Sequence, residues 1–252
     1  MMERMIDLKT HTIYTRTNGV GKPPVIFEAG MNNDSNTWRH VEPKVAEFTT
    51  TVVYDRAGLG RSSQPMTTRT LNTMLRDLGN VLEKLEISPP YILVGHSLGG
   101  LLVRLYAASN LANMAGLILV DAPHERQHAE AKNRLSAKTW ELVSEFWQQS
   151  AEAIDLAHEF ANVGPVGLLG NLPLVVLSAT VPETPPSVIP VEMARELHEV
   201  SSTIKLAFQQ KLAAESSCGQ HILVEGAGHD IHWQRPDVVI EAIHTMVLSA
   251  NA

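Results

Sequence analysis

The sequence predicts an α/β fold in which a largely parallel sheet is flanked by helices. Runs such as Leu117–Val120 and Leu174–Leu177 are apolar throughout, which is typical of strands buried on both faces. Longer segments between such runs carry apolar residues at helical spacing. Because strand-like and helix-like segments alternate along most of the chain, they favour a parallel sheet with crossover helices.

The elements can be placed in order along the chain. Two short strands, 6–9 and 12–16, are predicted to form an opening hairpin. Further strands are expected at 24–30, 50–56, 91–95, 115–123, 172–180 and 220–226. Helices are expected at 36–48, 71–85, 98–110, 191–214 and 236–248. In open sheets of this kind, sites form at the carboxyl ends of the strands, so the chemically active residues should follow strands.

The stretch 122–171 interrupts this alternation between the sixth and seventh strands. Its part SAKTWELVSEFWQQSAEAIDLAHEFANV has helical content. We interpret 122–171 as a helical cap over the strand ends, inserted into a core formed by 1–121 and 172–252. The alternative is one long crossover helix with loops.

Composition limits the function classes. The chain has 252 residues and a formal net charge of −7, so it lacks the basic footprint of a nucleic-acid binder. No apolar run is long enough to span a bilayer, and residues 1–20 lack the apolar segment of a signal peptide. Cys218 is the only cysteine, which excludes an internal disulfide. These observations predict a cytoplasmic protein with no nucleic-acid or membrane partner.

The stretch VGHSLGG places Ser97 between Gly95 and Gly99 in the pattern G-x-S-x-G. A strand-like run precedes it and a helix-like run follows it, which is the context that a nucleophile elbow requires. Bulky side chains at the two glycine positions would collide with the neighbouring strand and helix at such a sharp turn. We therefore expect Ser97 to be a nucleophile, rather than one serine of a plain glycine-rich turn.

A serine nucleophile needs a base. His229 follows the last predicted strand, in VEGAGHDIHWQRP, and is the expected base. The alternative is His232, which should face elsewhere because the loop turns into a helix there. His96, next to the nucleophile, is expected to pack or hydrogen-bond beneath the turn.

The third member is a carboxylate that orients the imidazole and stabilises its charged form. Asp121 directly follows a strand, in LILVDAP, and is the expected acid. Glu183, in the proline-rich loop after the next strand, is the runner-up, since that loop would have to fold inward. A purely structural role for Asp121 would be to cap the first helix of the inserted segment.

An oxyanion hole needs two backbone N–H donors. One should come from Leu98, the residue after the nucleophile, and the other from Met31, in the loop after the strand 24–30. The side chains of Asn32 and Asn33 follow, and turn chemistry explains them better than catalysis.

The substrate contacts and metal sites carry weaker signals. Trp140, Phe146 and Trp147 of the inserted segment are candidate substrate contacts, although packing between helices explains them equally well. No metal site is expected, because the histidines and carboxylates lack ligand-like spacing. His124 and His128 are four positions apart, but without the H-E-x-x-H pattern.

Together these segments resemble the α/β-hydrolase fold superfamily. The resemblance is carried by FEAGMNNDSNTW, VVYDRAGLGRSS, LVGHSLGG, LILVDAPHE and VEGAGHDIHWQRP, in family order over nearly the whole chain. It implies an eight-stranded, mostly parallel sheet and a cofactor-free hydrolase, in which Asp55 and Arg56 brace the oxyanion loop. The chain departs from the family where Ala29-Gly30 replaces the usual His-Gly, and where the common acid position after the seventh strand lacks its aspartate. Asp121 matches the position that some branches use after the sixth strand.

The expected reaction is hydrolysis of a small-molecule carboxylic ester or lactone through an acyl-enzyme, without a cofactor. Dehalogenases and epoxide hydrolases of this fold use an aspartate nucleophile, so Ser97 argues against both. Carbon–carbon bond hydrolases and perhydrolases share the triad and are alternatives. A slow signal receptor or regulatory binding protein that keeps the triad is the alternative outside the enzymes.

Overall fold

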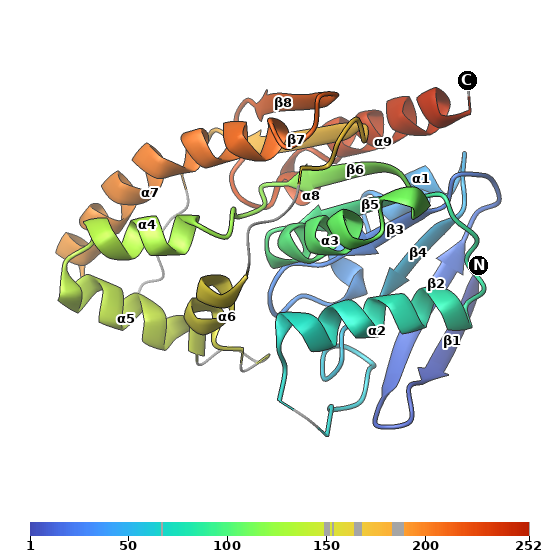
Figure 1. The fold of residues 1–252 in the computed structure, drawn as a ribbon, viewed down its shortest axis with the longest axis horizontal. Coiled ribbons are helices and arrows are strands. Elements are labelled where there is room, and N and C mark those ends of the chain that lie inside the picture. Colours follow the sequence, from blue (N-terminus) through green and yellow to red (C-terminus); the bar gives the residue numbers. More distant parts are fainter. Residues whose placement is uncertain (67, 149–151, 153, 164–167, 183–188, 252) are drawn as a thin grey trace.

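The computed structural model describes residues 1–66, 68–148, 152, 154–163, 168–182 and 189–251. It has an eight-stranded sheet with helices on both faces (Figure 1), which confirms the predicted α/β fold. The strands are β1 (Met2–Asp7), β2 (Thr12–Asn18), β3 (Val25–Glu28), β4 (Thr51–Tyr54), β5 (Tyr91–His96), β6 (Met114–Val120), β7 (Leu174–Ala179) and β8 (Gly219–Val224).

The helices include two short 3-10 turns. The α-helices are α1 (Glu42–Val45), α2 (Leu71–Lys84), α3 (Leu98–Ser109), α4 (Gln127–Arg134), α5 (Ala137–Gln148), α6 (Leu156–Asn162), α7 (Val191–Ala213), α8 (Ile231–Gln234) and α9 (Pro236–Ala250). The 3-10 turns are η1 (Ser35–Trp38) and η2 (Leu111–Asn113).

The strand order is β1-β2-β4-β3-β5-β6-β7-β8. β2 pairs antiparallel with β1 and with β4, and every other neighbouring pair is parallel. The expected opening hairpin and mostly parallel sheet are therefore confirmed. β8 lies at the edge and most of its side chains are accessible to solvent.

Alternate side chains of the central strands enter two apolar layers, one on each face of the sheet. Leu93 and Leu119 pack in the layer that contains apolar residues of α2 and α3. Val94 and Ile118 pack in the layer formed with α1 and α9. All four side chains are fully buried, as expected for strands covered on both faces.

The single helix expected at 36–48 is wrong. The chain instead forms η1 and, after a break, the short α1. Pro43 lies in the first turn of α1, where its missing N–H costs nothing, but it could not continue a longer helix from Trp38. The apolar spacing was still informative, because Trp38, Val41 and Val45 are all fully buried.

The carboxyl ends of the central strands meet at one edge of the sheet. His96 at the end of β5 is in register with Val120 of β6, and Val120 with Leu177 of β7. Ala179 at the end of β7 is in register with Val224 of β8. The loops that leave these four strands therefore begin close together.

The segment between β6 and β7 forms α4, α5 and α6 in its described part. These helices lie beyond the strand ends, together with the first half of α7 (Figure 1). Ile204 and Phe208 of α7 pack against Ala131 and Leu135 of this segment, whereas Leu212, further along α7, packs in the core of the sheet. None of the described helices is long and apolar enough to cross a lipid bilayer.

Candidate active site

Ser97 lies at the turn between β5 and α3, in a backbone conformation that residues with a Cβ atom rarely adopt. Its φ and ψ angles are 51° and −124°. The Ser97 N–H donates to the carbonyl oxygen of Val120 at 3.1 Å, which ties the turn to β6. Strained backbone of this kind persists where the surroundings enforce it, and it often marks a functional position.

The two glycines of the motif are explained by close backbone contacts. A Cβ atom on Gly99 would lie 2.4 Å from the carbonyl oxygens of both Glu28 and Ala29. A Cβ atom on Gly95 would lie 2.5 Å from the carbonyl oxygen of Gly99. The first turn of α3 can therefore approach the end of β3 because Gly99 lacks a side chain, and it can approach β5 because Gly95 lacks one.

Asp121 directly follows β6 and contacts His229, which lies in the loop after β8. The His229 Nδ1 and Asp121 Oδ2 atoms are 2.7 Å apart, and Asp121 Oδ1 accepts the N–H of Ala179 at 2.9 Å. Asp121 is 3% exposed and has a φ of 47°, so its carboxylate is held in a strained, buried turn. Because a carboxylate can only accept, Nδ1 of His229 carries the proton of this bond.

The environment keeps Asp121 ionised. Burial would raise the pKa of its carboxyl, but the hydrogen bond from His229 and the charge of Lys205 together hold that pKa below its ordinary value. An ionised carboxylate is the form that orients the imidazole and stabilises the imidazolium.

Lys205 was not identified from the sequence. Its Nζ atom lies 2.6 Å from Asp121 Oδ2, the same oxygen that contacts His229. The residue comes from the middle of α7. A lysine on a helix with a polar face normally points to solvent, and no local sequence signal connects it with Asp121.

His96 and His232 lie beside His229 but are engaged elsewhere. The ring centroid of His96 is 4.6 Å from that of His229 and 4.3 Å from that of His232. His96 Nε2 contacts the carbonyl oxygen of His229 at 3.0 Å, and burial holds the pKa of its imidazole well below the usual value. His232 Nε2 contacts Thr37 Oγ1 at 2.8 Å. His96 therefore packs beneath the turn as a neutral ring, and His232 faces η1.

The loop after β3, which carries Met31, is clamped by a buried guanidinium. Arg56 donates to the carbonyl oxygens of Ala29 and Gly30, at 2.6 Å each. It also donates to Glu28 at 2.7 Å. This is the bracing that the family resemblance implies for Arg56.

Glu152, from the segment between α5 and α6, completes this clamp and was not identified from the sequence. Its carboxylate accepts from Arg56 Nε and Nη2, at 2.7 Å each, and from the N–H of Asn32 at 2.7 Å. The contact with Arg56 lowers the pKa of the Glu152 carboxyl, against the effect of its burial. A residue of the inserted segment is thereby bonded to the neighbour of Met31.

A cavity of about 670 Å³ opens at these residues. Ser97, Asp121 and His229 line it together with Met31 and Leu98. Much of its remaining wall is apolar and comes from the inserted segment and α7, including Ala131, Leu135, Val143, Leu156, Phe160, Leu197 and Ile204. The structure thus brings the predicted nucleophile, base and acid to the wall of one cavity.

The other predicted contacts fall elsewhere. Trp140 packs against the apolar cluster that joins α4 and α7, and it is not among the described residues that line the cavity. The side chains of Phe146 and Trp147 lie outside the described residues, as does Glu183. Phe160 does line the cavity and stacks on His128, with ring centroids 4.2 Å apart.

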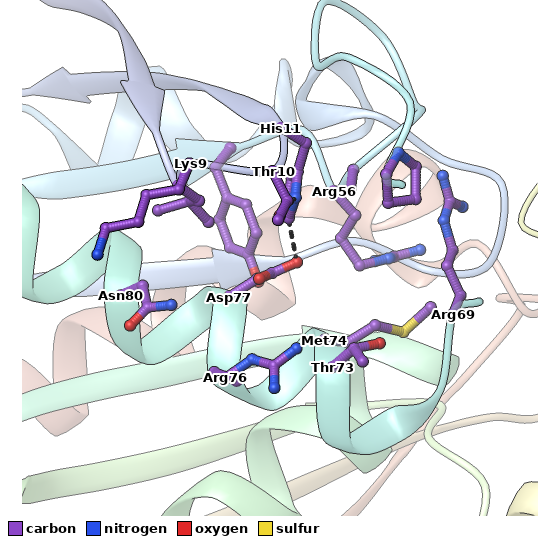
Figure 2. A pocket seen from close by; sticks show the side chains of 14 residues that line it. Lys9, Thr10, His11, Arg56, Arg69, Thr73, Met74, Arg76, Asp77 and Asn80 are labelled. Carbon is purple, nitrogen blue, oxygen red and sulfur yellow. Dashed lines mark hydrogen bonds and ion pairs between the residues drawn. The ribbon is translucent and has the colours of Figure 1, made fainter. Parts of the chain in front are cut away.

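A second cavity, of about 330 Å³, lies between the β1–β2 turn and α2 (Figure 2). Lys9, Arg56, Arg76 and the His11–Asp77 pair line it. The Nε2 and Oδ2 atoms of that pair are 3.0 Å apart. None of the predicted catalytic residues is among its described lining residues, so it is separate from the candidate site.

Two groups of described side chains each bring three possible metal ligands within 4.8 Å of one another. The first group consists of His124, Glu125 and Glu215. The Arg104 guanidinium already donates to both of its carboxylates, so a positively charged side chain occupies the place between them. The other group joins His96 and His232 to Asp230, whose side chain is 52% exposed. Its histidine Nε2 atoms are engaged by the His229 carbonyl and by Thr37.

Comparison with known proteins shows which sequences and folds this chain is similar to. Over 237 residues the chain is 26% identical to the uncharacterized protein YqjL of Bacillus subtilis (strain 168), covering 90% of this chain and 84% of that protein. The structure resembles a thermophilic esterase from Thermogutta terrifontis, with a TM-score of 0.69, 18% identity and full coverage of both chains. It also resembles a bromoperoxidase from Bacillus anthracis, with a TM-score of 0.67 and 18% identity over 97% of this chain and 99% of that one.

These two structural likenesses are likenesses of fold. The family model described as alpha/beta hydrolase fold matches residues 23–160, a range that includes β3 to β6, Ser97 and Asp121. Because this match spans more than half of the chain, the protein belongs to the alpha/beta hydrolase fold family.

Proposed function

We propose that this protein is a serine hydrolase that cleaves a carboxylic ester or lactone through an acyl-enzyme. The observation that carries the proposal is the contact of 2.7 Å between His229 Nδ1 and Asp121 Oδ2, at a cavity that Ser97 also lines. A serine on a strained turn, an imidazole and a buried carboxylate are the three groups that this chemistry requires.

In the first step, Ser97 Oγ attacks the carbonyl carbon of the substrate while His229 takes its proton. Since Nδ1 of His229 faces Asp121, Nε2 is the nitrogen that accepts the proton. Asp121 stabilises the imidazolium that results. The N–H groups of Met31 and Leu98 donate to the oxyanion of the tetrahedral intermediate, and the amide dipoles of α3 add to that stabilisation.

In the second half of the reaction, His229 protonates the leaving alcohol and the carbonyl re-forms as an acyl-enzyme on Ser97. Water then enters and His229 acts again as the base. The hydroxide equivalent attacks the acyl carbon, the bond from that carbon to Ser97 Oγ breaks, and His229 returns its proton to Oγ, which releases the acid and restores the serine. No step needs a cofactor.

The wall of the cavity points to an uncharged, mostly apolar acyl or alcohol group. Its described apolar side chains come largely from α4 to α7, and Lys205 and Asp121, which carry opposite charges there, are paired with each other. We assign the segment 122–171, together with the first half of α7, the role of a cap over this substrate.

The proposal is tested by hydrolysis of p-nitrophenyl esters from acetate to octanoate and of a set of lactones. Ser97→Ala should lose at least about a thousandfold in kcat/KM. Ser109→Ala, at the exposed far end of the same helix, is the matched control and should keep wild-type rates. Equal rates in wild type and Ser97→Ala would contradict the mechanism. A folded wild type without turnover would favour a carbon–carbon bond hydrolase or a receptor.

A further inference from the structure

The Asp121 carboxylate has one more donor than a serine hydrolase triad requires. Ala179 N–H donates to Oδ1, while His229 Nδ1 and Lys205 Nζ both contact Oδ2, at 2.7 and 2.6 Å. A backbone N–H and a histidine are enough to hold and use this carboxylate. The ammonium group of Lys205 therefore needs its own explanation.

Lys205 is not a loosely held surface side chain. Only 22% of its side chain is exposed, and it lines the same cavity as Ser97. One turn further along α7, the Gln209 Nε2 atom donates to the carbonyl oxygen of Ala122 at 2.6 Å. Gln209 Oε1 accepts from Ser178 Oγ at 3.0 Å. These bonds fix α7 against the ends of β6 and β7, so Lys205 is presented to Asp121 by a rigid element.

The charge of Lys205 acts against the charge that develops during catalysis. When His229 takes a proton, two cations share one carboxylate oxygen. The negative charge of Asp121 favours the protonated form of His229, and the positive charge of Lys205 disfavours it. The imidazolium is therefore stabilised less than it would be without the ammonium group. The same ammonium group also fixes the carboxylate in place for the His229 contact.

We propose that Lys205 is a positioning residue that holds the Asp121 carboxylate and restrains the basicity of His229. This inference rests on the proposed function of Ser97, His229 and Asp121. It assigns to α7 a part in setting the pH range over which the enzyme works.

Among the described residues, His96, His232 and Asp230 are further titratable groups near His229. Burial lowers the pKa of His96 well below its usual value and that of His232 to about 3, so both are neutral near pH 7. Asp230, the next residue, has a side chain that is 52% exposed to solvent. In the described part of the chain, Lys205 is the cation that contacts the Asp121–His229 pair.

The test is the pH dependence of kcat/KM between pH 5 and 9, measured with p-nitrophenyl butyrate. Lys205→Met keeps an unbranched side chain that is one atom shorter and removes its charge. We expect the acidic limb of the profile to move to higher pH by about one unit. At a pH below this limb, the fraction of His229 in the neutral, basic form would then be about tenfold smaller than in the wild type. Lys205→Arg retains the charge and should keep the wild-type limb. Lys211→Met is the control for the loss of a positive charge elsewhere on α7, because Lys211 Nζ lies over the Phe208 ring.

An unchanged acidic limb in a folded Lys205→Met would overturn the inference. So would a shift in Lys205→Arg or in Lys211→Met as large as the shift in Lys205→Met. A second measurement separates this inference from the proposed function. The Cε1–H signal of His229 can be titrated by NMR in wild type and in Lys205→Met, each combined with Ser97→Ala. An upward shift of the His229 pKa in Lys205→Met supports the inference even if ester hydrolysis is absent, and no shift refutes it.

Discussion

The Nδ1 atom of His229 lies 2.7 Å from Oδ2 of Asp121, although 108 positions separate the two residues in the sequence. The contact is possible because β6, β7 and β8 are parallel neighbours whose carboxyl ends meet at one edge. The sharp turn at Asp121, with its φ of 47°, then presents the carboxylate across β7 to the loop after β8.

The first prediction concerns the identity of the acid. Asp121→Asn should reduce kcat/KM for a p-nitrophenyl ester by about a thousandfold or more, because an amide cannot stabilise the imidazolium and favours the wrong tautomer. Glu183→Gln is the matched comparison and should retain activity. The reverse result, with activity lost in Glu183→Gln and kept in Asp121→Asn, would move the acid to the loop after β7.

The second prediction concerns the turn that carries Ser97. Gly99→Ala would place a Cβ atom 2.4 Å from two carbonyl oxygens of the β3 end, and these backbone atoms cannot move aside cheaply. We expect the free energy of unfolding to fall by about 2 kcal/mol or more and ester hydrolysis to be lost. Gly79→Ala, in the interior of α2, is the control: its Cβ would meet Tyr106 at an ordinary 3.6 Å, so stability should rise by up to about 1 kcal/mol. Chemical denaturation measures both changes.

The third prediction concerns the bond between the inserted segment and the oxyanion loop. Glu152→Gln removes the charge that holds Arg56 and weakens the acceptor of the Asn32 N–H. If this displaces the Met31 N–H, kcat should fall by about a hundredfold while KM changes little. Glu159→Gln is matched to it, because Glu159 also links the inserted segment to the core, through the N–H of Leu71 at 2.8 Å. An equal loss of kcat in both variants would show a general effect of loosening the segment.

Local patterns were sufficient to predict the sheet, the Ser97 turn and the strand-end positions of Asp121 and His229. Uninterrupted apolar runs identify strands covered on both faces, and the rule that sites follow strands then selects a few residues among many. The two glycines beside Ser97 identify a backbone contact that the structure shows directly.

Lys205 and Glu152 could not be found in this way. Each is an ordinary charged residue of a helical segment in the sequence, and each gains its role only when α7 or the inserted segment packs over the strand ends. The helix expected at 36–48 failed for a different reason. Its apolar spacing was correct, but Pro43 divides it.

The most direct test of the account is covalent labelling of the intact protein with a fluorophosphonate, followed by mass spectrometry. These reagents react with serine hydroxyls that a neighbouring base activates. We predict one phosphonyl group per chain, located on Ser97, and a much slower reaction in His229→Ala. A folded protein that is labelled elsewhere, or that reacts equally fast without His229, would contradict the assignment of Ser97 as the activated nucleophile.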